Sequence, residues 1–486
     1  MSISVTLNPG NRQFYNNVWY VGGENAIIDN ATANTWISSG IAYVSPNQPR
    51  GLVETFPSTA AFQASVVNGA PAISNINGNI QIFDGTNILD KNGRPLLKNI
   101  ADRCRINETL NAGVKYINSQ SGHHNRSDLT LTSIALIVGN YTLSTSQGEI
   151  GNGAATSVTA SIEYPIGNYQ PITFNGLHNG SIPNAGLLLS DTNTLATPIP
   201  PGGFYRVKLS VGNANGAIYC AYQDSAQLGD GMYYSGSALG DTSNSAISAG
   251  GGSSNPSCVR PLAVLGYSNR PSHLGIGDSR MLAQGDSTAS AAGYAGYFER
   301  GLSPYFATMT QGVSGDTLAN FLTTNNVNRL FLAGYATHIH CEYNVNDIVF
   351  NSSALATLQT NLSAFGALFP KKAIIPYTLE PYNSSSDSWA TLANQSLTGA
   401  TSNAKDAVRT AYNDWLRSGA YNVTGLSFAN FMQAVDIASV LESSLDSGKW
   451  IVNGASGYPT IDGAHATSAL NAIAGTPVVF NNWQYT

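Results

Sequence analysis

The chain of 486 residues carries unusually little charge. Lys, Arg, Asp and Glu together make up 10% of it, against the ~25% of an average soluble protein. The polar surface must therefore be built from Asn, Ser, Thr, Gly and Tyr, a composition typical of β-rich extracellular or virion proteins and of surfaces that face carbohydrate. The 486 residues are enough for two or three domains, and a hydrophobic content of 42% allows sizeable cores.

Basic clusters and long apolar runs are missing as well. The net charge is −6, and neutralising phosphates needs clustered Lys and Arg, so we expect no nucleic-acid partner. No apolar run approaches the ~20 residues that span a bilayer. Residues 1–5 carry neither a basic head nor an apolar segment, which argues against a secretory signal. The location of the protein stays unknown, and the composition favours an extracellular or virion-associated one.

Cysteine is scarce, with four residues and no metal-knuckle spacing among them. Cys220 and Cys258 flank a Gly/Ser-rich segment, residues 226–257, which they either close with a disulfide or border as two buried thiols.

Two histidine-containing stretches have the spacing of metal ligands. One is the pair His123 and His124; the other is His338, His340 and Glu342, which would share one face of a strand. A solvated loop for the first and polar packing for the second are simpler interpretations. We therefore expect no metal and no cofactor.

The first half of the chain reads as β structure. Segments 18–21 and 80–83 predict strands, and 99–112 predicts a helix. Alternating segments at 129–138, 158–164 and 204–211 predict an antiparallel β-sandwich. We place a β-rich N-terminal region, used for attachment or as part of the sandwich, at 1–120. A jelly-roll-like sandwich domain follows at 121–260.

Beyond residue 260 short apolar runs alternate with helical stretches. Segments 330–335 and 373–377 predict strands, and 353–369, 403–417 and 466–474 predict helices. This alternation indicates an α/β domain over 261–486, with a parallel sheet between helices. Sites in such sheets gather at the carboxyl ends of the strands.

Four short blocks in this region carry the residue types of acyl transfer. Gly277-Asp278-Ser279 follows an apolar strand, and a small residue before the serine suits a tight strand-to-helix turn that exposes the hydroxyl. A serine hydroxyl needs a histidine to take its proton, and that histidine needs a carboxylate to orient it. Asp462 and His465, three residues apart, can meet both needs at one place. The backbone N–H groups of Ser279 and Gly315 and the amide of Asn346 could stabilise an oxyanion.

In this order and with this spacing, the four blocks resemble the SGNH (GDSL-type) hydrolase superfamily over roughly residues 262–486. The resemblance implies a three-layer α/β/α, flavodoxin-like domain that hydrolyses esters through an acyl-enzyme. It implies Ser279 as nucleophile and first oxyanion donor, with Gly315 and Asn346 as the other donors. It implies His465 as base and Asp462 as its orienting acid. The β-rich region is similar to the accessory β-domains of some carbohydrate-active members.

The chain departs from the family pattern at three positions. Arg280 stands where the family often has Leu, Asn344 replaces the usual Gly before Val345, and Ala466 replaces a frequent Pro after His465. None of these changes removes a catalytic group. We expect Arg280 and Asn344 to contact the substrate.

The predicted function is that of a serine esterase that removes acyl groups, most readily acetyl, from a polysaccharide. Its expected partner is an acylated carbohydrate, and a homo-oligomer stays open. Two alternatives remain. One is a lipase-like or thioesterase-like acyl hydrolase. The other is a non-enzymatic virion or surface protein that binds carbohydrate on a hydrolase fold.

Overall fold

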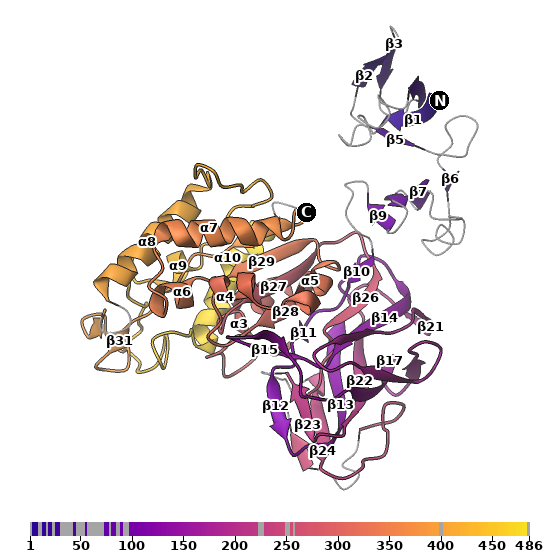
Figure 1. The fold of residues 1–486 in the computed structure, drawn as a ribbon, viewed down its shortest axis with the longest axis horizontal. Coiled ribbons are helices and arrows are strands. Elements are labelled where there is room, and N and C mark those ends of the chain that lie inside the picture. Colours follow the sequence, from indigo (N-terminus) through magenta and orange to yellow (C-terminus); the bar gives the residue numbers. More distant parts are fainter. Residues whose placement is uncertain are drawn as a thin grey trace. The chain divides into compact units, whose positions relative to one another are not determined.

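The computed structural model describes residues 97–221, 228–247, 258–397 and 402–483, and in addition the backbone of single strands before residue 97 and at 253–255 (Figure 1). The chain folds into two compact units, residues 1–97 and 98–486. The domain boundaries expected at 120 and 260 stay predictions. Within the described residues, no helix combines the length and the apolar character that crossing a membrane requires.

The N-terminal unit is built from short strands in small sheets. The segments expected at 18–21 and 80–83 are strands, as predicted. One sheet has the order β4-β1-β5, β2 pairs with β3, and another sheet has the order β6-β7-β8-β9. The bounds are β1 (Ser2–Leu7), β2 (Arg12–Tyr15), β3 (Val18–Val21), β4 (Asn25–Asp29), β5 (Ala42–Val44), β6 (Glu54–Thr55), β7 (Ala72–Ile76), β8 (Asn79–Phe83) and β9 (Ile88–Asp90).

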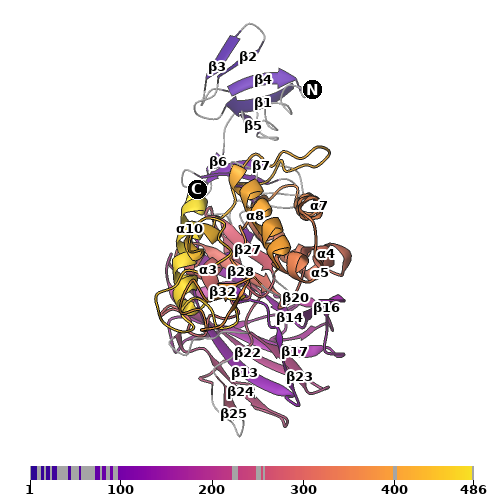
Figure 2. The ribbon, with the colours of Figure 1, turned by 90° about the vertical axis from the view of Figure 1, so that its left-hand side faces the viewer.

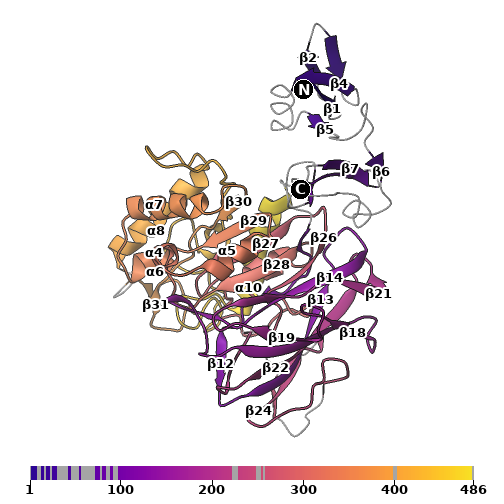
Figure 3. The same cartoon turned by 45° about the vertical axis from the view of Figure 1, so that its right-hand side comes forward.

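Two antiparallel sheets dominate residues 109–267, which we call the β-rich region. The larger has the order β18-β17-β22-β13-β24-β25, with β19 also paired to β17. Its bounds are β13 (Tyr116–His124), β17 (Thr156–Glu163), β18 (Tyr169–Ile172), β19 (Asn179–Ile182), β22 (Phe204–Asn213), β24 (Gly231–Ser235) and β25 (Ser253–Asn255). Figure 3 shows β13, β22 and β24 below the strands of the α/β region.

The second sheet has the order β10-β26-β14-β20, with β21 also paired to β14. Two small hairpin-like pairs, β12 with β23 and β15 with β16, complete the region. The expected strands at 129–138, 158–164 and 204–211 correspond to β14, β17 and β22; the jelly-roll arrangement stays a prediction. The remaining bounds are β10 (Leu97–Asn99), β12 (Thr109–Ala112), β14 (Leu131–Gly139), β15 (Thr142–Ser144), β16 (Gly148–Ile150), β20 (Leu187–Leu189), β21 (Asn193–Ile199), β23 (Ala217–Cys220) and β26 (Ala263–Tyr267).

Residues 272–483, which we call the α/β region, supply four strands of a parallel sheet of order β11-β28-β27-β29-β30, and β11 comes from an earlier part of the chain. Figure 2 shows α3 and α10 on one side of this sheet and α4, α5 and α7 on the other. The strands are β11 (Cys104–Arg105), β27 (Ser272–Gly277), β28 (Ala307–Gly312), β29 (His338–Glu342) and β30 (Ala373–Pro376), with the short pair β31 (Ser384–Ser385) and β32 (Gln395–Ser396). The helices are α3 (Gly296–Leu302), α4 (Leu318–Thr323), α5 (Val327–Ala333), α6 (Val345–Val349), α7 (Leu355–Ala367), α8 (Asn403–Ser418), α9 (Ala438–Leu441) and α10 (Ser468–Trp483).

Two secondary-structure predictions are wrong. Residues 99–112 form no helix; they contain the end of β10, then β11 and β12, because β11 pairs in parallel with β28 and completes the edge of the sheet. Residues 330–335 lie mostly in α5 rather than in a buried strand. The carboxylate of Glu149 accepts the backbone N–H groups of Asn328 and Arg329, both at 2.8 Å, and so caps the start of this helix from the β-rich region.

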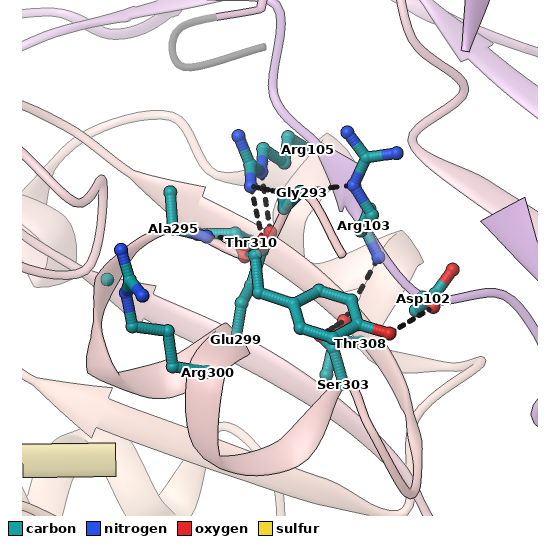
Figure 4. A network of polar contacts seen from close by, with 12 residues as sticks. Asp102, Arg103, Arg105, Gly293, Ala295, Glu299, Arg300, Ser303, Thr308 and Thr310 are labelled. Carbon is teal, nitrogen blue, oxygen red and sulfur yellow. Dashed lines mark hydrogen bonds and ion pairs between the residues drawn. The ribbon is translucent and has the colours of Figure 1, made fainter. Parts of the chain in front are cut away.

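A network of buried polar side chains ties β11 to the α/β region (Figure 4). The Arg105 guanidinium makes a two-pronged ion pair with Glu299 of α3, with Nε 2.5 Å from Oε1. The Arg103 Nε donates to the carbonyl of Gly293 at 3.0 Å, and its backbone N–H donates to the Thr308 hydroxyl at 3.2 Å. The strand that precedes the β-rich region is therefore an integral part of the parallel sheet.

Replacing Arg105 tests this connection. Arg105→Ala leaves the Glu299 carboxylate buried without its cation, which costs about 3–5 kcal/mol. We expect the urea midpoint of unfolding, followed by tryptophan fluorescence, to fall accordingly. Arg270→Ala, which removes an exposed guanidinium, is the matched control and should leave the midpoint unchanged. Equal midpoints for both variants would contradict the role assigned to Arg105.

Candidate active site

The nucleophile candidate lies at the carboxyl end of the central strand β27. A Cβ on Gly277 would lie 2.4 Å from the carbonyl oxygen of Glu342, so only glycine lets β27 and β29 approach this closely. The same carbonyl accepts the backbone N–H of Asp278 at 3.1 Å. The chain after Ser279 forms turns rather than a helix. The Gln284 N–H donates to the Ser279 carbonyl at 2.9 Å, and the next helix, α3, begins only at Gly296. The expected turn is present, without a helix directly behind it.

The structure brings the serine and the two C-terminal residues together. Ser279 Oγ lies 2.7 Å from His465 Nε2, and His465 Nδ1 lies 2.6 Å from Asp462 Oδ2. The side chains of His465 and Asp462 are 13% and 43% exposed, while Ser279 is 6% exposed. A proton can therefore pass from the hydroxyl to an imidazole whose other nitrogen is held by a carboxylate.

The Asp462 carboxylate is fixed by its own loop. Its Oδ1 accepts the backbone N–H groups of Ala464 and His465, each at 2.9 Å. Burial raises the pKa of this carboxyl, but the hydrogen bonds from His465 and Ala464 outweigh burial and hold the pKa well below its usual range. The group is thus ionised wherever the histidine has to be oriented.

The loop that carries His465 needs a glycine. Gly463 has a φ of +81°, and a Cβ there would lie 1.9 Å from the carbonyl oxygen of Asn383. Its own carbonyl accepts the indole N–H of Trp450 at 3.1 Å. This tight contact fixes the segment between Asp462 and His465 against the body of the domain.

The predicted oxyanion donors lie around the same serine. Asn346 Nδ2 donates to the carbonyl of Asp316 at 2.9 Å and lies 3.4 Å from Asp278 Oδ2, so it joins the residue after Gly315 to the residue before Ser279. Gly315 has a φ of +76°. Among the described residues, the backbone N–H groups of Ser279 and Gly315 form no hydrogen bond within the protein. Both therefore remain available to an oxyanion.

Arg280 and Asn344, the expected substrate contacts, both turn inwards. Arg280 is 4% exposed; its Nε donates to the Ala464 carbonyl at 3.2 Å and lies 3.2 Å from a carboxylate oxygen of Glu380. Asn344 is 1% exposed, and its Nδ2 donates to the Tyr412 hydroxyl at 2.7 Å. These contacts give both side chains a positioning role, since neither offers its polar head to solvent.

The backbone explains why an asparagine suits position 344. Its φ is +88°, in the left-handed region at the start of α6. Asparagine is, after glycine, the residue that tolerates this conformation best.

A group of buried carboxyls lies behind Ser279. Glu342 Oε2 accepts the backbone N–H of Met281 at 3.0 Å. Burial and the charges of Asp278 and Glu380 raise the pKa of Glu342 well above its usual value, and burial also raises the pKa of Asp278, although Arg280 opposes it. Glu380 was missed at the sequence level, because it lies 100 residues beyond Arg280 with no motif around it.

The histidines of the two stretches with metal-ligand spacing contact other protein groups. His340 Nδ1 lies 2.8 Å from the Tyr377 hydroxyl and its Nε2 lies 2.9 Å from His273 Nδ1. Burial lowers the pKa of His273 and His340 well below the usual value, so both rings are neutral. His123 bonds the Asp102 carbonyl at 2.7 Å.

The sulfur of Cys220 lies 2.9 Å from Asn111 Nδ2 and 3.5 Å from the Met232 sulfur, contacts of a buried side chain in the β-rich region. They agree with the buried-thiol alternative.

A hairpin of the β-rich region borders the site. Strands β15 and β16 are joined by a turn in which Thr145, Ser146 and Gln147 are exposed. Thr145 Cγ2 lies 3.7 Å from the position that a Cβ on Gly315 would take. Glu149, which caps α5, fixes the base of this hairpin. The β-rich region therefore forms part of the rim beside Gly315.

Because the pKa of Glu342 is raised, the free energy of unfolding should depend on pH. Between its unfolded value of ~4.3 and its higher folded value, the native state binds more protons than the unfolded state, so stability falls as pH rises. Glu342→Gln removes this titration and imitates the protonated carboxyl. We expect the unfolding free energy, measured by urea unfolding, to fall less between pH 5 and 8 in this variant than in the wild type.

Asp414→Asn removes a carboxyl that is 58% exposed and should keep the wild-type pH dependence. Identical pH dependence in Glu342→Gln and the wild type would refute the assignment of a buried, proton-binding Glu342.

No protein-family model matches the sequence, and no curated protein matches it. Solved structures do match. A GDSL-like lipase from Bacteroides thetaiotaomicron is 13% identical over 44% of this chain and 87% of its own, with a TM-score of 0.29. A member of the lipolytic protein G-D-S-L family from Veillonella parvula is 15% identical over 44% of this chain and 97% of its own, with a TM-score of 0.28. A carbohydrate esterase family 3 protein from Talaromyces cellulolyticus is 15% identical over 44% of this chain and 97% of its own, with a TM-score of 0.27.

Proposed function

We propose that the chain is a serine esterase that works through an acyl-enzyme, and that its substrate is an O-acetylated polysaccharide. The observation that carries the proposal is the chain of two short contacts, 2.7 Å from Ser279 Oγ to His465 Nε2 and 2.6 Å from His465 Nδ1 to Asp462 Oδ2. These residues come from opposite ends of the α/β region, and each atom has the partner that nucleophilic catalysis requires.

The first half of the reaction forms the acyl-enzyme. His465 Nε2 takes the hydroxyl proton while Ser279 Oγ attacks the ester carbonyl carbon, and Asp462 stabilises the imidazolium that results. Negative charge then develops on the carbonyl oxygen. The N–H groups of Ser279 and Gly315 would receive it, together with an amide hydrogen of Asn346 that now makes only the 3.4 Å contact with Asp278. The carbon–oxygen bond to the alcohol then breaks, and His465 gives its proton to the leaving alkoxide, which completes the acyl-enzyme.

The second half releases the acid. A water molecule loses a proton to His465 and attacks the acyl carbon, and His465 returns this proton to Ser279 Oγ as the acyl–oxygen bond breaks and the carboxylic acid leaves. Apart from the ester and water, the cycle needs only groups that this chain supplies.

Polar residues beside Gly315 support a small acyl group on a hydrophilic alcohol. The Ser314 hydroxyl donates to Gln284 Oε1 at 3.0 Å, and Thr145 lies beside Gly315. A low-charge surface rich in hydroxyls and amides also suits a polysaccharide. A lipase-like or thioesterase-like hydrolase would prefer an apolar surface at this point. Comparing rates on p-nitrophenyl acetate and p-nitrophenyl decanoate separates the two, and faster cleavage of the decanoate would favour the lipase alternative.

Removal of the nucleophile tests the esterase directly. Ser279→Ala should lower kcat for acetate release from acetylated xylan and from p-nitrophenyl acetate by at least ~10³-fold, because the covalent route is lost. Acetate is measured enzymatically. The control Ser237→Ala changes an exposed serine of the β-rich region and should retain full activity. Unchanged release by Ser279→Ala would leave the non-enzymatic carbohydrate-binding alternative as the better account.

A further inference from the structure

The outer face of the large sheet in the β-rich region carries a groove that the esterase does not use. Along β13, β17 and β22 the residues Ile117, Val158 and Val211 are buried on the inner face. Their sequence neighbours alternate to the other face, where directly paired residues form rows across the sheet. The groove on this face has a volume of about 210 Å³.

Two rows form the floor of the groove. Tyr116, Gly212 and Ser157 lie opposite one another in the first. Asn118, Ser210 and Thr159 lie opposite one another in the second, which Asn179 of β19 extends. The floor therefore presents one aromatic ring among hydroxyls and amides.

The ring of Tyr116 lies close over Gly212, which is its neighbour across the sheet. A Cβ on Gly212 would be 3.3 Å from Tyr116 Cδ1 and 2.8 Å from Ser157 Oγ. Tyr116 is nevertheless 36% exposed. A half-exposed ring that is supported from below by a glycine offers a flat apolar platform with a hydroxyl at its edge.

Residues 239–245 cross the same face and form a wall of the groove. Asn118 Nδ2 donates to the Gly240 carbonyl at 2.8 Å, and Thr242 N–H donates to Ser210 Oγ at 3.2 Å. Asp241 and Leu239 line the groove from this segment. The Thr159 hydroxyl faces the Asp241 carboxylate, so this wall is held to the floor of the groove by polar contacts.

We propose that this groove is a binding site for a neutral polysaccharide chain, separate from the site of ester hydrolysis. One sugar ring stacks on Tyr116, and its hydroxyls bond to the exposed side chains of Asp241 and Asn179. The lining residues include a carboxylate and no Lys or Arg, which disfavours an anionic sugar. The volume is below the ~300–1,000 Å³ of sites for drug-sized ligands, which suits one sugar residue of a chain that continues along the open sheet face. None of the candidate catalytic residues lies on these strands (Figure 3).

Affinity electrophoresis tests the proposal. Native gels are cast with galactomannan, glucomannan, xylan or dextran as neutral polymers and with polygalacturonate as the anionic one. Every protein carries Ser279→Ala, so that no polymer is altered during the run and binding at the catalytic site is the same throughout. We expect at least one neutral polymer to retard this protein, and Tyr116→Ala to weaken the retardation about tenfold or more.

Two further variants sharpen the result. Gly212→Ala keeps the tyrosine but displaces its ring, so it should weaken binding as Tyr116→Ala does. Tyr305→Ala removes a different tyrosine, 43% exposed and located in the α/β region, and should bind like the parent. The proposal is overturned if no neutral polymer retards the parent, if Tyr116→Ala and Tyr305→Ala bind alike, or if polygalacturonate binds most tightly.

The test is independent of the proposed esterase. With Ser279 intact, Tyr116→Ala should hydrolyse p-nitrophenyl acetate at the wild-type rate. Hydrolysis without groove binding would defeat only the binding site, and groove binding without hydrolysis would defeat only the esterase.

Discussion

The hydrogen bond between Ser279 and His465 is the constraint around which the α/β region is arranged. It joins two residues that are 186 positions apart, at 2.7 Å. Two close backbone approaches make this possible, since Gly277 lets β27 approach the carbonyl of Glu342 and Gly463 lets the C-terminal loop approach Asn383. Arg280 adds a direct link, because its guanidinium holds the carbonyl of Ala464, next to the histidine. Ser279 and His465 are thus positioned by close backbone contacts as well as by their own hydrogen bond.

The β-rich region and the α/β region are physically interlocked. β11 lies before the β-rich region in the sequence and yet forms the edge of the parallel sheet, where Arg105 pairs with Glu299. The β-rich region in turn contacts the α/β region, because Glu149 caps the start of α5. In the same hairpin, Thr145 lies beside Gly315. Because Glu149 caps α5, the hairpin of β15 and β16 cannot move without disturbing this helix.

Local patterns made the candidate site predictable. The turn around Ser279 and the three-residue spacing of Asp462 and His465 are properties of short segments, so the sequence alone could indicate them. Residues 330–335 were mistaken for a strand, because the cap that begins α5 comes from Glu149, far away in the chain. The segment 99–112 was mistaken for a helix, because its pairing with β28 is a long-range contact. Glu380 had no local signal at all.

The central claim is that Ser279 is activated by His465 for attack on an acyl group. The most direct measurement is labelling of the folded protein with a fluorophosphonate, followed by peptide mass spectrometry to locate the adduct. The account predicts a single adduct on Ser279, formed at least ~10³-fold more slowly in His465→Ala because the general base is missing. Failure of Ser279 to label, or equally fast labelling in His465→Ala, would contradict it.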